Sequence, residues 1–179
     1  MRRALCLSLV FAATPPVLPA QDKKPPTGQV QRGRDLFTKS PKGIPCGTCH
    51  SLAGVGTAIG PDLTTLASAV GSHGLAMSIR VTAMAYVQEV QTSSATFPGM
   101  LKQKQGDEIE IWDLSQTPPA IRKYAAKDVL SMKANQTWKH PPASAGYTSQ
   151  EMADLVGFLK WAATGSAKEV KIEDVEDAK

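Results

Sequence analysis

Two cysteines and a histidine stand together in the segment Cys46-Gly47-Thr48-Cys49-His50. The pattern Cys-x-x-Cys-His is typical of covalent attachment of a c-type haem. Two thiols at this spacing can join the two vinyl groups along one porphyrin edge, and the histidine that follows supplies a nitrogen ligand to the iron. The small residues Gly47 and Thr48 allow the loop to run close to the ring. The segment therefore predicts one covalently attached haem c, held by Cys46 and Cys49, with His50 as the proximal ligand.

A Cys-x-x-Cys pair has three other uses: a redox dithiol, a zinc half-site and a plain disulfide. A thioredoxin-like dithiol belongs to a βαβ unit, whereas the preceding residues 39–45, Lys-Ser-Pro-Lys-Gly-Ile-Pro, are typical of a turn-rich loop. A structural zinc site needs four ligands, and the histidines outside the motif, His73 and His140, lie far away in the sequence. The motif and its setting together favour haem attachment over these alternatives.

The N-terminus has the pattern of an export signal. Two arginines precede an apolar stretch over residues 4–13, and prolines follow it. The stretch is much shorter than the roughly 20 apolar residues of a membrane span. We therefore expect residues 1–20 to be a secretory signal peptide, cleaved after Ala20 together with Cys6. The mature protein is then expected to be periplasmic or secreted, without a membrane span; an uncleaved anchor is the alternative.

Length and composition are those of one globular domain. The 179 residues are 42% hydrophobic and 20% charged, which argues against a largely disordered chain. The formal net charge is +4, from 20 basic and 16 acidic residues, and there is no Arg/Lys-rich run. This pattern gives no reason to expect nucleic-acid binding. We expect residues 21–28 to be a flexible N-terminal segment, 29–166 to be the main domain, and 167–179 to be a charged, mobile tail.

The sequence around the motif resembles the class I mono-haem cytochrome c family. The segment Gln-Arg-Gly-Arg-Asp-Leu-Phe is similar to the family's first helix, with Gly33 and Phe37 on one helical face. Residues 60–63, Gly-Pro-Asp-Leu, resemble the family's Gly-Pro-x-Leu turn. By this resemblance, the carbonyl of Pro61 accepts the Nδ1 proton of His50. Such a hydrogen bond fixes the tautomer of the imidazole and raises its basicity as a ligand.

The C-terminal part of the chain extends the resemblance. Thr148 and Glu151 are spaced as a capping box, and the residues that follow carry apolar side chains at helical spacing. In the family's last helix, a leucine and an aromatic residue three positions later cross the first helix, and Leu155 and Phe158 match these positions. Gly33 then permits close approach of the two helix backbones. The resemblance implies a mainly α, cytochrome c-like helical haem fold.

Residues 86–125 do not continue this helical pattern. Residues 108–114, Glu-Ile-Glu-Ile-Trp-Asp-Leu, alternate as expected for a half-buried strand. Segments 86–92 and 120–124 have weaker strand patterns, whereas residues 128–132 indicate a short turn or helix. We therefore expect a small antiparallel β insertion over 86–125 beside the haem fold. This layout also resembles, more loosely, haem-binding cytochrome modules of environmental bacteria.

Several residues are candidates for the distal iron ligand. Class I cytochromes c usually carry a Met-Pro step shortly before the last helix, and here the step at that place is His-Pro, beginning at His140. His140 is therefore the first choice. Met132 and Met100 are the alternatives, and His73 is a weaker candidate. Trp138, two residues before His140, is expected to pack near the distal side.

The predicted site favours a one-electron carrier over an enzyme. Bis-histidine ligation would saturate the iron and set a lower reduction potential than histidine with methionine. The expected partners are redox proteins such as a dehydrogenase, an oxidase or another cytochrome, meeting the protein through a small transient patch. One alternative is an electron-accepting cytochrome subunit of a periplasmic dehydrogenase or oxidase complex, which the β insertion motivates. The other is an open-site haem enzyme or sensor, for which the sequence shows no recognisable acid/base constellation.

Overall fold

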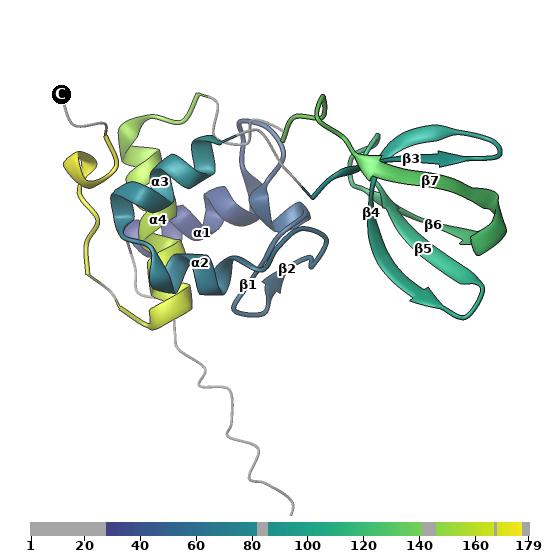
Figure 1. Ribbon diagram of the computed structural model, residues 1–179. Coiled ribbons are helices and arrows are strands. Elements are labelled where there is room, and N and C mark those ends of the chain that lie inside the picture. The colour runs from purple at the N-terminus through teal and green to yellow at the C-terminus, as the bar shows by residue number, and fades with distance from the viewer. Residues whose placement is uncertain (1–27, 82–85, 141–145, 167, 177–179) are drawn as a thin grey trace, which may run out of the picture.

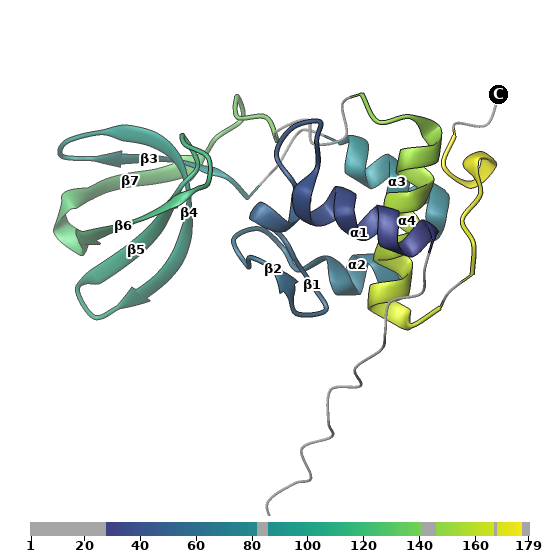
Figure 2. The ribbon, with the colours of Figure 1, turned by 180° about the vertical axis from the view of Figure 1, so that it is seen from behind.

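A computed structural model describes residues 28–81, 86–140, 146–166 and 168–176. The predicted signal peptide and almost all of the predicted flexible segment lie outside the described residues. The described chain forms two lobes, one of helices and one of strands, which lie side by side (Figures 1 and 2). Within these described ranges, no helix is long and apolar enough to cross a membrane.

The helical lobe consists of four α helices: α1 (Gln29–Lys39), α2 (Leu63–Ala69), α3 (Ser72–Arg80) and α4 (Ser149–Thr164). The other three helices all pack against α4. Their apolar faces form one core, because each helix buries one side against its neighbours. The largest side chains of this core include Leu36, Phe37, Leu52, Leu75, Met152, Leu155, Val156, Phe158 and Leu159.

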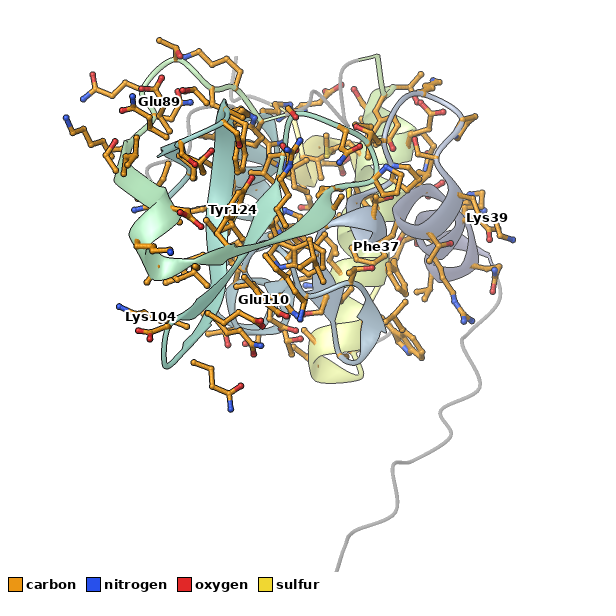
Figure 3. The ribbon with its side chains drawn as sticks, turned by 90° about the vertical axis from the view of Figure 1, so that its right-hand side faces the viewer. Phe37, Lys39, Glu89, Lys104, Glu110 and Tyr124 are labelled. Carbon is orange, nitrogen blue, oxygen red and sulfur yellow. The ribbon has the colours of Figure 1, made fainter. Side chains whose placement is uncertain are left out.

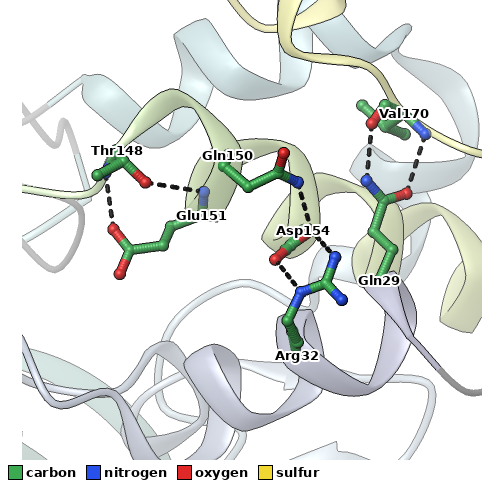
Figure 4. Close-up of polar contacts among 7 residues, drawn as sticks. All are labelled: Gln29, Arg32, Thr148, Gln150, Glu151, Asp154 and Val170. Carbon is green, nitrogen blue, oxygen red and sulfur yellow. Dashed lines mark hydrogen bonds and ion pairs between the residues drawn. The ribbon is translucent and has the colours of Figure 1, made fainter.

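The crossing of α1 and α4 depends on Gly33. A Cβ atom at this position would lie 1.9 Å from the carbonyl oxygen of Asp154 and 2.7 Å from the Cβ of Phe158. Only glycine therefore allows the two backbones to come this close. Nearby, the rings of Phe37 and Phe158 pack with their centroids 5.6 Å apart. Arg32 donates two hydrogen bonds, of 2.6 and 2.9 Å, to the buried Asp154 carboxylate (Figure 4). The predicted helix crossing is confirmed.

Local hydrogen bonds determine where α4 begins. The hydroxyl of Thr148 accepts a bond of 3.2 Å from the N–H of Glu151, and the Glu151 carboxylate accepts one of 2.7 Å from the N–H of Thr148 (Figure 4). Lys42 also donates to this carboxylate, at 2.7 Å. At the other end, Gly165 adopts the left-handed conformation, with φ of 74°, which is common after the last turn of a helix. The predicted capping box is confirmed.

A five-stranded antiparallel sheet forms the second lobe (Figures 1 and 2). Its strands are β3 (Gln88–Thr92), β4 (Thr96–Gln105), β5 (Glu108–Asp113), β6 (Ala120–Ala125) and β7 (Val129–Ala134). The order in space is β6-β5-β4-β3-β7, so the last strand returns to pair with the first. The buried side chains Val90, Phe97, Ile109 and Ile111 form a core that belongs to the sheet.

The sheet is larger than the sequence predicts. The segment 128–132, expected to be a turn or helix, contributes most of strand β7, in which Met132 stands opposite Val90. The sheet therefore continues to Ala134, beyond the expected end at residue 125. The reason is that β7 pairs with β3, a partner distant in sequence, which a local pattern does not reveal. With four α helices and a five-stranded sheet among the described residues, the fold is mixed α/β rather than mainly α.

Ion pairs join the neighbouring strands β4, β5 and β6. The carboxylate of Glu110 is only 7% exposed, and it lies 2.6 Å from the ammonium groups of both Lys102 and Lys123. Figure 3 views the protein from the sheet side, with Glu89, Lys104, Glu110 and Tyr124 labelled on the strands. Side chains of both charges therefore lie on this lobe.

The C-terminal segment 168–176, called the strap below, packs on the helical lobe. Val170 is 5% exposed and Val175 is fully buried. The side-chain amide of Gln29 donates to the carbonyl of Val170 and accepts from its N–H, at 2.7 and 3.0 Å (Figure 4). Arg80 donates to the carbonyl of Val175 at 3.1 Å. The expectation of a mobile tail is wrong for these residues, because the two valines anchor an otherwise charged segment.

Short elements complete the fold. They are the 3-10 helices η1 (Cys46–Thr48), η2 (Ala126–Asp128) and η3 (Ile172–Asp174), and the two-residue strands β1 (Ser51–Leu52) and β2 (Val55–Gly56). β1 and β2 pair as a small hairpin directly after the Cys-x-x-Cys-His segment. η1 therefore lies within the Cys-x-x-Cys-His segment, and the hairpin follows the segment directly.

Candidate functional site

The Cys-x-x-Cys-His segment forms a compact loop on the helical lobe. The N–H groups of Cys49 and His50 both donate to the carbonyl of Cys46, at 3.1 and 2.9 Å. Gly47 lies against α1, since a Cβ there would be 3.1 Å from the ring of Phe37. The predicted first helix therefore supplies the surface on which this loop rests, and the loop brings both thiols and the imidazole to one place.

Cys46 and Cys49 are both partly buried, and they do not form a disulfide with each other. Burial raises the pKa of the Cys46 thiol to about 11 and also raises the pKa of the Cys49 thiol. A catalytic or redox cysteine instead needs a lowered pKa, because the thiolate is the reactive form. The environment of these thiols therefore argues against the thioredoxin-like alternative.

The imidazole of His50 is oriented by the turn that follows the motif. Its Nδ1 lies 2.8 Å from the carbonyl oxygen of Pro61. A carbonyl can only accept, so Nδ1 carries a proton, and Nε2 is the ring nitrogen that can bind a metal. Gly60 packs on the same ring, since a Cβ there would lie 2.7 Å from Cε1 of His50. The predicted hydrogen bond between His50 and Pro61 is confirmed.

Two adjoining cavities lie beside this loop, and they share the side chains of Cys46, His50, Tyr86 and His140. The first cavity lies among the helices, and its apolar lining comprises Leu63, Leu66, Leu75, Ile79, Val81 and Leu159. The second lies between the loop and the base of the sheet, where its lining includes Val87, Met100, Leu114, Pro119 and Trp138. The candidate site is therefore an apolar cleft between the two lobes.

His140 faces His50 in this cleft. The centroids of the two imidazole rings are 5.8 Å apart, and the ring planes make an angle of 35°. Two imidazole nitrogens that each bind one metal at roughly 2.0–2.1 Å would place the ring centroids about 6 Å apart. The residues present therefore fit a metal group held between two imidazoles. The role of His140 as a ligand stays a prediction. Trp138 lines the cleft beside His140, as predicted.

The other candidate ligands lie in different places. Met100, on β4, lines the sheet side of the cleft together with His50 and His140. Met132, on β7, packs against the core of the sheet and lines neither cavity of the cleft. His73 is exposed on α3 and lines a separate cavity beside the strap. Among the described residues, no three His, Cys, Asp or Glu side chains gather in a metal-binding group.

The sequence did not reveal how the sheet contributes to the site. Tyr86, Val87 and Leu114 line the cleft, yet none of them belongs to a haem-binding pattern. The one available signal is position, because Tyr86 and Val87 directly precede β3 and Leu114 directly follows β5. The register of the sheet brings these residues together, because Gly99 of β4 stands opposite both Gln88, at the start of β3, and Asp113, at the end of β5.

Comparison with known protein families agrees with this geometry. Residues 30–116 match the model of the cytochrome c family. The chain contains a cytochrome c domain. No curated protein matches the chain. The match runs from α1 through the motif loop into the sheet and ends before α4, although α4 completes the helical core around the loop.

Membership of this domain in the cytochrome c family assigns its cofactor class. The Cys46 and Cys49 pair lies within the matched residues and is consistent with covalent haem c. Proteins of the family are typically electron-transfer proteins, which implies partners that are themselves redox proteins.

Proposed function

We propose that this protein is a one-electron carrier whose single haem c is held by Cys46 and Cys49, with His50 and His140 as axial ligands. When bound, the haem supplies the one-electron chemistry through the ferric and ferrous states of its iron. The observation that carries the proposal is the pair of facing imidazoles, whose centroids are 5.8 Å apart in the cleft that contains both thiols.

The surrounding residues support a carrier role. The Pro61 carbonyl keeps the proton of His50 on Nδ1 and raises the basicity of the ligating nitrogen. The leucine and isoleucine side chains of the helical cavity keep water away from the cleft. A second imidazole on the distal side leaves no position for a substrate, so the arrangement favours a carrier over an open-site haem enzyme or sensor. Bis-histidine ligation also favours a lower reduction potential than histidine with methionine.

We further propose that the protein acts in the periplasm or is secreted. The support for this is the sequence of residues 1–20, in which arginines, a short apolar stretch and prolines follow one another as in an export signal. Covalent haem attachment is consistent with export, because the chain must reach a compartment that holds the attachment machinery before its two thiols can react with the vinyl groups.

The substitution His140→Ala tests the proposed ligation. The full chain is produced with haem-maturation machinery, and the ferric spectrum and the binding of carbon monoxide to the ferrous protein are compared with those of the wild type. We expect a low-spin wild type without the near-infrared methionine–iron band, and a largely high-spin variant that binds carbon monoxide rapidly. His73→Ala, on the surface of α3, is the matched control and should behave as the wild type.

Two outcomes would overturn this assignment. An unchanged ligand-field spectrum in His140→Ala would remove His140 from the coordination sphere. A methionine–iron band in the wild type, lost in Met100→Ala or Met132→Ala, would assign a methionine ligand instead and raise the expected potential.

One observation favours a second candidate, the electron-accepting subunit of a dehydrogenase or oxidase complex. Leu101, Ile121 and Leu130 on the sheet lobe are 51%, 43% and 60% exposed, and a stable complex would bury such side chains. The test is purification of the chain from its native source with a catalytic subunit in a fixed ratio. Leu130→Ser should weaken that association if the sheet is the interface, and a monomeric chain that is reduced only by transient encounters would exclude the complex.

A further inference from the structure

One side chain holds the connection between β7 and His140 in a tight turn. Oδ1 of Asn135 accepts hydrogen bonds from the N–H of Thr137 at 3.0 Å, from the hydroxyl of Thr137 at 2.9 Å, and from the N–H of Trp138 at 2.9 Å. An amide oxygen has two lone pairs, so three donors saturate it. Asparagine side chains commonly form turns of this kind with the backbone that follows them.

The same residue attaches the turn to the base of the sheet. The N–H of Asn135 donates to the carbonyl of Val87 at 2.9 Å, directly beyond the last pair of the β3–β7 ladder, Gln88 with Ala134. Val87 is fully buried and lines the cleft. The turn is therefore a continuation of strand pairing, and the register of β3 and β7 determines where the turn begins.

The turn ends beside the distal imidazole. The indole of Trp138 lies edge-on to His140, with ring centroids 6.2 Å apart and planes at 86°. Both side chains line the sheet-side cavity of the cleft. Because Asn135 fixes the backbone of Trp138, the indole is held in place, and it limits the orientations that the His140 ring can adopt.

We propose that Asn135 and Trp138 are positioning residues that hold the His140 imidazole opposite His50, and that the β sheet is the scaffold of the distal ligand. This inference rests on the bis-histidine ligation proposed above. It gives the insertion a role within the haem site: β3 and β7 carry the chain from the end of the helical lobe to the distal side of the cleft and fix its position there.

Asn135→Ala, studied in the haem-loaded full chain, tests the proposal. The variant loses the acceptor of three hydrogen bonds, so the state in which His140 has left the distal position becomes more populated, by about tenfold or more. The rate of carbon monoxide binding to the ferrous protein should rise by the same factor toward that of His140→Ala. Asn135→Asp keeps an acceptor oxygen at the same place and should restore a rate close to that of the wild type. Trp138→Ala should also raise the rate.

Thr92→Val is the matched control for general damage to the sheet. Thr92 Oγ1 accepts hydrogen bonds from the N–H groups of Ser94 and Ala95 at the other end of β3. This variant should lose stability without a change in carbon monoxide binding.

The possible results separate the two hypotheses. Wild-type binding rates in Asn135→Ala and Trp138→Ala, together with fast binding in His140→Ala, would overturn the positioning role and leave the ligation intact. Equal increases in Asn135→Ala and Thr92→Val would also overturn it, because the effect would then be general loss of structure. A wild-type spectrum in His140→Ala would refute the ligation and the positioning role together.

Discussion

Replacing Gly33 by alanine tests whether the backbones of α1 and α4 are in contact. The added Cβ would stand 1.9 Å from the carbonyl oxygen of Asp154 and 2.7 Å from the Cβ of Phe158. The first of these atoms belongs to the backbone of α4 and cannot rotate away. The two helices must therefore separate, which also lengthens the hydrogen bonds between Arg32 and Asp154 and loosens the contact between Phe37 and Phe158.

Two opposing effects determine the size of the change. Overpacking of a well-packed core costs about 1–3 kcal/mol, and the loss of neighbouring contacts places Gly33→Ala near the upper limit. Alanine is favoured over glycine inside a helix by roughly 0.5–1 kcal/mol, which offsets part of this cost. We therefore expect a net loss of about 2 kcal/mol in the free energy of unfolding, equivalent to a fall in Tm of roughly 4–8 °C for a chain of this size.

Thermal unfolding of the haem-loaded protein, followed by circular dichroism and calorimetry, measures this change. Gly74→Ala in α3 is the control, because its Cβ would meet only a methyl group of Val70, at 2.8 Å, which can move. Its Tm should be unchanged or slightly raised. The haem spectrum should be the same in both variants, since neither glycine lines the cleft. A Tm for Gly33→Ala equal to that of the wild type would show that the helices do not cross at this contact.

Two further predictions concern the proximal side and the pH dependence of stability. Gly60→Ala places a Cβ 2.7 Å from Cε1 of His50, so the imidazole should tilt and the g values of the ferric protein should shift; an unchanged spectrum would contradict the packing of Gly60 on the ring. The hydrogen bond from Lys42 lowers the pKa of Glu151 in the folded protein. The ionised Glu151 carboxylate therefore stabilises the fold above the unfolded-state pKa of about 4.3, and this stabilisation is lost as the pH falls through the lower folded-state pKa. The free energy of unfolding, measured with urea at a series of pH values, should therefore fall more steeply with decreasing pH in the wild type than in Glu151→Gln; parallel curves for the two proteins would refute this reasoning.

The features that could be predicted from the sequence depend on residues whose size or local spacing decides the structure. The hydrogen bond from His50 to Pro61 and the capping box of α4 each join residues at most 11 positions apart. Gly33 lies where two helices distant in sequence cross. A glycine on a helix face allows a neighbouring backbone to pack closely, whatever the position of the partner helix in the sequence. These signals were enough to place the motif loop, the first helix and the last helix.

The features that were missed depend on partners far apart in the sequence. Strand β7 is a strand because β3 lies beside it, and its own residues do not alternate clearly. The strap was expected to be mobile because its charged residues dominate its composition, although Val170 and Val175 are sufficient to anchor it. The base of the sheet lines the cleft through single residues at strand ends, which no local pattern distinguishes from ordinary loop residues.

The place of the sheet in the chain has a consequence for folding. Helices α1 and α4 meet although Arg32 and Asp154 are 122 residues apart, and contacts between such distant residues form slowly, because a long loop must close first. Neighbouring strands of the sheet pair mostly through short turns, and the sheet has a core of its own. Once it has formed, Gln88 and Ala134 are paired at its base, which brings the two flanking parts of the chain together. The insertion therefore lengthens the chain but shortens the loop that must close when α4 docks on α1.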